Sequence, residues 1–207
     1  MKKKRLGAAA LLLTSCLFTG CVFPAENYEF VMHEGIAPPE GGWTVQSLAE
    51  VSYVQDVKLS YPLTLNTFGE KYTYEKIYEP EYYKENRFTT LKRFNDDVGT
   101  VILAEPDPKA ISADTEITYM GLWDNMPDFC INGITAGSSY DDVVAAFGEP
   151  DYEYQNDNTP GGNRYVQYDN TENGEGILLI KLTANSVCMV TLNFSEDVSW
   201  HIGQQGE

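Results

Sequence analysis

The clearest pattern of apolar and polar positions lies in the second half of the chain, between residues 137 and 150. Val143, Val144 and Phe147 are spaced so that they form one apolar face of a helix. Ser138 precedes them, and Asp141 follows three residues later, which is the spacing of a capping box. Acidic residues at this end also suit the positive end of the helix dipole. The pattern predicts a short, capped helix.

The predicted helix ends in Phe147-Gly148-Glu149, and Pro150 prevents its continuation. A shorter version of the pattern lies in the first half, where Pro62 suits a helix start and the tripeptide Phe68-Gly69-Glu70 recurs. A tyrosine-rich, strand-like run follows each block. The tripeptide alone recurs easily by chance, but its repeated context favours two related halves.

Alternating apolar residues after each helix predict antiparallel strands. The Asn173-Gly174 pair is a strong hairpin signal between two of them. The main predicted strands are Arg87–Phe94, Val98–Ala104, Thr115–Leu122, Arg164–Asp169, Gly176–Leu182 and Val187–Phe194. The sequence therefore predicts an α+β fold of two related units, each a short helix followed by an antiparallel β-meander.

The N-terminal segment has the composition of an export signal. Basic residues at positions 2–5 precede an apolar run over Leu6–Leu17, which is shorter than the ~20 residues of a membrane-spanning helix. We expect residues 1–20 to be a signal peptide. Residues 21–42 are rich in proline and glycine and are predicted to be a tether, although a part of them could instead pack against the domain.

The end of this signal, Phe18-Thr19-Gly20-Cys21, resembles a bacterial lipobox, with Phe18 in the position where leucine is usual. The resemblance implies that Cys21 is lipidated and becomes the mature N-terminus, which would anchor the protein on the extracytoplasmic face of the cell membrane. Two acyl chains give stable anchoring, whereas one gives only reversible binding. The alternative is an ordinary cleaved signal.

The net charge of the chain limits the kinds of partner that it can bind. The 207 residues include 14 basic and 31 acidic residues, a formal charge of −17, and removal of residues 1–20 leaves 10 basic residues against 31 acidic ones, or −21. Such a surface argues against nucleic acid, which needs clustered basic residues. The content of hydrophobic (43%) and aromatic (13%) residues is too high for a disordered acidic tail, so we expect a folded domain.

Two cysteines remain after the signal and the lipidation site. Cys130 and Cys188 could form a disulfide outside the cytoplasm or could be two buried free thiols, and the sequence does not choose between them. The histidines are His33 and His201, which lie far apart in the sequence, so neither a metal site nor a bound cofactor is expected.

The segment from Ile131 through Gly137 and Val143 to Phe147-Gly148-Glu149-Pro150 resembles a recurrent module. The module occurs in BamE-type outer-membrane lipoproteins and in the tandem-repeat β-lactamase inhibitor protein, and it is similar to modules in lipoproteins of Gram-positive bacteria. The match covers about 65 residues, Ile131–Phe194. It implies a helix followed by a three- or four-stranded antiparallel sheet, and the first half of the chain matches only loosely. With the internal repeat, we expect a divergent unit over residues 43–128 and a BamE-like unit over residues 129–207. The resemblance implies no reaction and no partner.

The residues that suggest binding are tyrosines. Tyrosine is common at binding surfaces because it gives a large contact area at a low cost in conformational entropy. The candidates are Tyr72, Tyr74, Tyr78, Tyr82 and Tyr83. The simpler interpretation is an edge strand with half-buried tyrosines.

No catalytic motif is found, and adjacent acids such as Asp141 and Asp142 usually form a solvated helix cap. The sequence favours a non-enzymatic, membrane-anchored module that binds an extracytoplasmic protein or envelope component or assists assembly. The alternatives are an inhibitor of an extracellular enzyme and, less favoured, a small carboxylate-dependent hydrolase. A broad aromatic sheet would favour binding, and a deep pocket with converging acids would favour the hydrolase.

Overall fold

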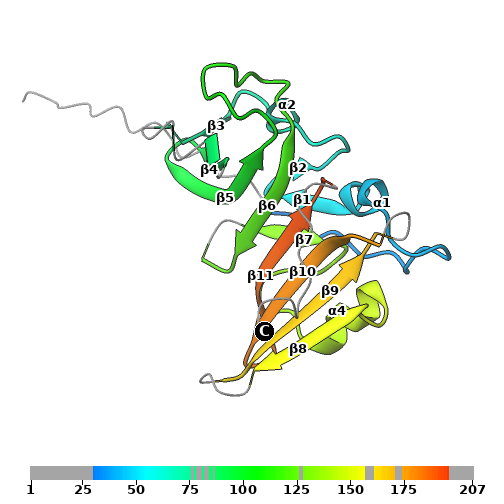
Figure 1. The fold of residues 1–207 in the computed structure, drawn as a ribbon. Coiled ribbons are helices and arrows are strands. Elements are labelled where there is room, and N and C mark those ends of the chain that lie inside the picture. Colours follow the sequence, from blue (N-terminus) through cyan, green and yellow to red (C-terminus); the bar gives the residue numbers. More distant parts are fainter. Residues whose placement is uncertain are drawn as a thin grey trace, which may run out of the picture.

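The structure, a computed structural model, describes residues 30–75, 77, 81, 84–85, 87–125, 128–156, 161–170 and 174–195. Within these ranges the chain forms two antiparallel sheets of three and eight strands (Figure 1). The small sheet has the order β2 (Val57–Lys58), β1 (Ser52–Val54) and β7 (Phe129–Ile131).

The large sheet consists of two four-stranded meanders that join at their last strands, β6 and β11. The first meander is β3 (Tyr72–Tyr74), β4 (Phe88–Arg93), β5 (Asp96–Leu103) and β6 (Ile117–Trp123). The second is β8 (Tyr152–Asn156), β9 (Asn163–Asp169), β10 (Gly176–Thr183) and β11 (Ser186–Asn193). The order across the sheet is therefore β3-β4-β5-β6-β11-β10-β9-β8.

The predicted α+β class is wrong, because the protein is mainly β. Strands make up 43% of the residues that the structure describes, and the helices whose bounds are described are short: α1 (Val45–Glu50), α2 (Leu65–Phe68) and α4 (Tyr140–Phe147). The physical reason is the pairing of β6 with β11 over five residue pairs. This pairing merges both meanders into one continuous sheet, so the helices only cover part of a large β structure.

The predicted helix of the second half is present as α4, but its cap is one residue later than predicted. Ser139, not Ser138, is the N-cap: its backbone N–H donates to Asp142 Oδ2 at 2.8 Å, and its hydroxyl accepts from the Asp142 N–H at 3.2 Å. Gly148 ends α4 with φ +86° and ψ −170°, and Gly69 ends α2 with φ +72° and ψ −177°. Side chains disfavour this backbone region, so both helices need glycine at this position.

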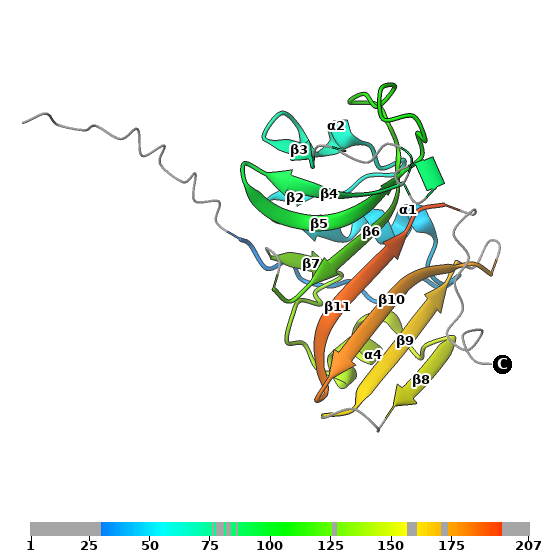
Figure 2. The same ribbon diagram turned by 60° about the vertical axis from the view of Figure 1, so that its left-hand side comes forward.

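One face of the large sheet forms the hydrophobic core. Figure 2 shows α4 behind strands β9 and β10, and the buried Val143 and Phe147 of α4 belong to the same core cluster as Ile180 and Val190 of the sheet. Leu48 of α1 and residues of the small sheet complete this cluster. We call the opposite face of the large sheet the outer face.

The first part of the described chain packs against the domain. Asn132 Oδ1 accepts from the Ile36 backbone N–H at 2.7 Å, and Asn132 Nδ2 donates to the Ile36 carbonyl at 3.0 Å. The His33 ring stacks on Tyr53, with ring centroids 3.4 Å apart. A Cβ at Gly35 would lie 2.4 Å from the Asn132 carbonyl oxygen, so only glycine allows this close approach. Residues 33–36 thus pack on the domain, which was one of the two alternatives for this part of the tether.

Candidate functional site

The outer face carries a row of large side chains that crosses five strands. Backbone register places these residues opposite one another, pair by pair, and paired residues of antiparallel strands point to the same face. From β6 to β8 the row consists of Trp123, Met189, Lys181, Tyr165 and Tyr154. We call this set the aromatic row. With strands about 4.8 Å apart, it spans about 19 Å.

Side-chain contacts link three neighbouring members of the aromatic row. The rings of Tyr154 and Tyr165 have centroids 6.3 Å apart, and Lys181 Nζ lies 5.6 Å from the centroid of the Tyr165 ring. This lysine geometry allows a cation–π attraction. Tyr154 is 48% exposed, and the other four members are half-buried. The row therefore presents area to a partner while its side chains are partly held by their neighbours.

Gly121 shapes the part of the outer face next to Trp123. A Cβ at position 121 would lie only 2.7 Å from Trp123 Cη2 and 3.4 Å from the Tyr119 hydroxyl. Glycine therefore lets both rings lie close to the sheet backbone. Phe88 extends this region, since it meets Tyr119 edge to face at 5.9 Å and is 44% exposed.

This arrangement suits association with a macromolecule. Tyrosine, tryptophan and methionine are enriched at protein interfaces, where their large surfaces supply most of the contact energy. Lysine is depleted there in general, but Lys181 lies between Met189 and Tyr165, where its aliphatic stem adds apolar area. A broad surface of this kind does not enclose a substrate.

The tyrosines predicted from the sequence do not form one surface. Tyr72 is buried, and its hydroxyl donates to Gln55 Oε1 at 2.7 Å, while burial raises the pKa of this phenol. Tyr74 is half-buried and lines a hollow of about 570 Å³ together with Ile77 and Lys84. The remaining candidates, Tyr78, Tyr82 and Tyr83, lie outside the described residues.

Sequence reasoning missed the members of the aromatic row. A signal was present for Lys181, which alternates with the buried Ile180 and Leu182. It was absent for Tyr154, whose neighbours along β8 are exposed. Alternation assigns such residues to a solvent-facing side of a strand, but it does not show which strands are neighbours.

Cys130 and Cys188 are both free thiols in the structure. Cys130 is buried in β7, and its Sγ donates to the His33 carbonyl at 3.4 Å. Cys188 lies in β11, with its Sγ 3.4 Å from Thr183 Oγ1 and 3.5 Å from the Lys181 carbonyl. The structure therefore shows two free thiols, of which Cys130 is buried, as that alternative expected, and Cys188 is half-buried. The predicted lipidation site, Cys21, lies outside the described residues.

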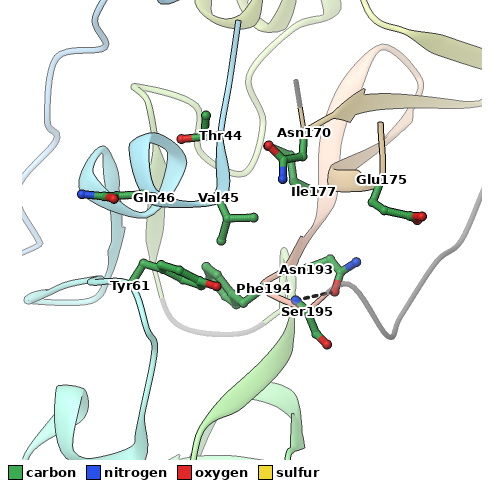
Figure 3. Close-up of a pocket in the computed structure, with 10 residues that line it drawn as sticks. All are labelled: Thr44, Val45, Gln46, Tyr61, Asn170, Glu175, Ile177, Asn193, Phe194 and Ser195. Atoms are coloured by element: carbon green, nitrogen blue, oxygen red, sulfur yellow. Dashed lines mark hydrogen bonds between the residues drawn. The ribbon is translucent and has the colours of Figure 1, made fainter. Parts of the chain in front are cut away.

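A small pocket of about 140 Å³ lies between the start of α1 and the ends of β10 and β11 (Figure 3). Its lining is polar and aromatic and includes Thr44, Tyr61 and Asn193. Glu175 is the sole carboxylate among the lining residues, whereas acid–base hydrolysis of the predicted kind uses a pair. This pocket therefore does not bring together the carboxylate pair that the hydrolase alternative needs.

Two further searches concern only the part of the chain that the structure describes. There, no three or more side chains of histidine, cysteine, aspartate or glutamate lie close enough together to hold a metal ion. In the same residues, no helix is both long and apolar enough to cross a membrane.

Comparison of the chain with protein-family models, with curated proteins and with solved structures found no match.

Proposed function

We propose that this protein is a non-enzymatic binding module whose outer sheet face binds a protein or a protein-bearing component of the cell envelope. The aromatic row is the observation that carries this proposal. Five large side chains from five strands lie in one line on the outer face, opposite the face on which Val143 and Phe147 of α4 pack. Interfaces of this composition gain most of their binding energy from a few central aromatic residues.

The N-terminal sequence supports the place where the module would act. In this proposal, lipidation of Cys21 holds the protein on the extracytoplasmic face of the membrane. A formal charge of −21 on residues 21–207 keeps the module away from anionic headgroups, so that the outer face remains available to a partner.

The proposal is tested by capture from a solubilised envelope extract with the purified full chain in detergent micelles. We compare the wild type with Trp123→Ala and Tyr165→Ala, which remove two members of the aromatic row. The matched control is Phe94→Asn, which removes an aromatic side chain that is 58% exposed in the β4–β5 turn. Asparagine tolerates the positive φ of +57° at this position.

We expect the same specific protein to be captured by the wild type and by Phe94→Asn, with a loss of tenfold or more for each aromatic-row variant. A loss of this size is typical when a central aromatic contact is removed. Equal capture by all four proteins would reject the outer face as the binding surface.

A further inference from the structure

The first residues of the described chain carry exposed aliphatic side chains. Val31, Met32 and Ile36 are 54%, 60% and 54% exposed. In the part of the chain that the structure describes, the other large hydrophobic side chains with high exposure are all aromatic: Tyr61, Phe88, Phe94, Tyr152 and Tyr154. The exposed large aliphatic side chains are therefore concentrated in one short stretch, residues 31–36, which we call the aliphatic segment.

The backbone of the aliphatic segment is held on the domain. The His33 ring stacks on Tyr53, and the His33 carbonyl accepts from Cys130 Sγ at 3.4 Å. Gly35 lies against the Asn132 backbone, and the Ile36 backbone makes two hydrogen bonds with the Asn132 side chain. The residues between the exposed positions thus bind the domain, while Val31, Met32 and Ile36 remain directed toward solvent.

The aliphatic segment lies on the side of the molecule opposite the outer face. Val54 of β1 and Phe129 and Ile131 of β7 belong to the hydrophobic core between the two sheets. Tyr53 and Cys130 alternate with these residues and pair in register, so they point to the other side of the small sheet. His33 contacts both of them there, and Figure 2 shows the segment in blue beside β7. The small sheet and the core therefore separate the aliphatic segment from the aromatic row.

The predicted anchor is close to the aliphatic segment along the chain. Val31 follows Cys21 by ten residues. Ten residues span at most about 36 Å when fully extended, and a flexible coil of this length has an r.m.s. reach of about 17 Å. A lipid at Cys21 would hold the aliphatic segment near the bilayer surface and raise its effective concentration there. A small apolar area then suffices to favour contact, because it leaves water at little further cost in translational freedom.

We infer that the aliphatic segment inserts Val31, Met32 and Ile36 into the interfacial region of the lipid bilayer. This contact turns the small-sheet side toward the membrane and the aromatic row away from it. The inference rests on the proposed function, because it requires the anchor at Cys21 and it gives the outer face its direction.

The charges on this side determine which lipid suits the contact. Glu34 and Glu40 are exposed in the same stretch of chain, and the exposed Lys58 pairs in register with Tyr53. The whole chain after residue 20 carries a formal charge of −21. Anionic headgroups therefore oppose close approach, and the contact is made by apolar side chains with zwitterionic lipid.

The test places the photocrosslinking residue p-benzoylphenylalanine at position 32 of the lipidated protein in phosphatidylcholine vesicles. The matched control has it at position 154, because Tyr154 is 48% exposed and lies on the outer face. Mass spectrometry measures the fraction of each peptide that carries a lipid adduct after irradiation. We expect at least tenfold more lipid adduct from position 32 than from position 154. Equal yields would overturn the inference.

A pair of double variants tests whether apolar contact is the cause. With the crosslinker at position 36, the double variant Val31→Ser and Met32→Ser should lower the lipid adduct severalfold. The matched control, Val31→Leu and Met32→Leu, keeps both side chains apolar and should leave the yield unchanged. Both positions are more than half exposed, so neither pair of changes disturbs the core. An unchanged yield in the serine variant, or a rise in yield when anionic phosphatidylglycerol is added, would contradict the inference.

The outcomes distinguish this inference from the binding role of the outer face. If position 32 yields no lipid adduct but partner capture still depends on Trp123 and Tyr165, only the membrane contact is wrong. On cells, a protein adduct from position 32 in place of lipid would likewise overturn it. If position 32 yields lipid but capture is indifferent to Trp123 and Tyr165, the membrane contact stands and the outer-face proposal fails.

Discussion

The two halves of the large sheet follow the same order of elements but are stabilised by different chemistry. The first half has a four-residue helix and a three-residue edge strand, and its interior contains Arg93, whose side chain is 5% exposed and donates to Asp56 Oδ1 at 2.7 Å. The second half has an eight-residue helix and a five-residue edge strand. There the Phe147 ring packs on Trp43 and Tyr168, with centroids 5.5 and 5.3 Å apart.

This comparison shows that two halves with the same order of elements can be stabilised by different kinds of side-chain contact. Where the regular elements are short, a buried cluster of polar side chains joins them: Tyr72 of β3 and Arg93 of β4 both donate to Gln55 Oε1. Where the helix is longer, its Phe147 ring packs directly on an aromatic ring of the sheet. The predictions below test this difference, and they are ordered by the size of the expected effect.

Truncation of the aromatic core should have the largest effect. We expect Phe147→Ala to reduce the free energy of unfolding by about 3–5 kcal/mol, because the side chain is 3% exposed and leaves a cavity. Phe68→Ala, at a 4% exposed position of the first half, should cost a similar amount. Because the halves share one sheet, both variants should unfold in a single urea transition. Two separate transitions would show that the halves are independent.

Substitution of the glycine that ends α2 or α4 should have the next largest effect on stability. Gly148→Val and Gly69→Val should each destabilise the protein by about 1–3 kcal/mol, because their backbone conformation strains any side chain. A Cβ itself would fit, since no atom lies within 4 Å of an added Cβ at Gly69 and the nearest atom at Gly148 is 3.9 Å away, so the strained backbone is the cost that both variants share. Melting curves unchanged for one variant and not the other would mean that the caps are not equivalent.

Replacement of an arginine should destabilise the protein more in the first half than in the second. Arg93→Met should cost about 2 kcal/mol, less than a fully buried pair would, because the partner Asp56 keeps a side chain that is 45% exposed. Arg164→Met should cost under about 1 kcal/mol, because Arg164 and Glu153 are both about one-third exposed. Equal costs in urea titrations would contradict the contrast between the buried Arg93 cluster and the more exposed pair of Arg164 with Glu153.

Acid should weaken the first half through Asp56. Partial burial alone would raise the pKa of this carboxyl, but its backbone hydrogen bond and the charge of Arg93 outweigh burial and hold the pKa below its ordinary value. The resulting stabilisation is present above about pH 4 and is lost as the pH falls through the lowered pKa. Urea midpoints between pH 5 and 2 should therefore fall less steeply in Arg93→Met than in the wild type. Parallel slopes would show that Arg93 does not set this pKa.

Local patterns predicted much of the local structure. The six main strands lie where alternation predicts them, and Gly148 has the expected positive φ. The N-cap was wrong by one residue because Ser138 and Ser139 are chemically equal, and only the Asp142 hydrogen bonds select the second. The capping rule identifies the element better than its boundary.

Long-range pairing could not be read from the sequence. The aromatic row takes one residue from each of five strands, and its existence depends on the contact between β6 and β11, whose residues are more than 60 positions apart. The same pairing made the fold mainly β. The tyrosines predicted to form a binding surface show the reverse error. Tyr72 was expected at the surface, but its hydroxyl is hydrogen-bonded to Gln55 and Arg93 in a buried polar network that no local sequence pattern predicts.

The most direct test of the binding account places a photocrosslinking side chain, p-benzoylphenylalanine, on living cells at position 189 or at position 61. Met189 lies within the aromatic row, between Trp123 and Lys181, whereas Tyr61, which is 50% exposed, lines the small pocket near α1. The account predicts a specific covalent adduct with one envelope protein from position 189 and none from position 61. An adduct from position 61 alone, or from neither position, would contradict it.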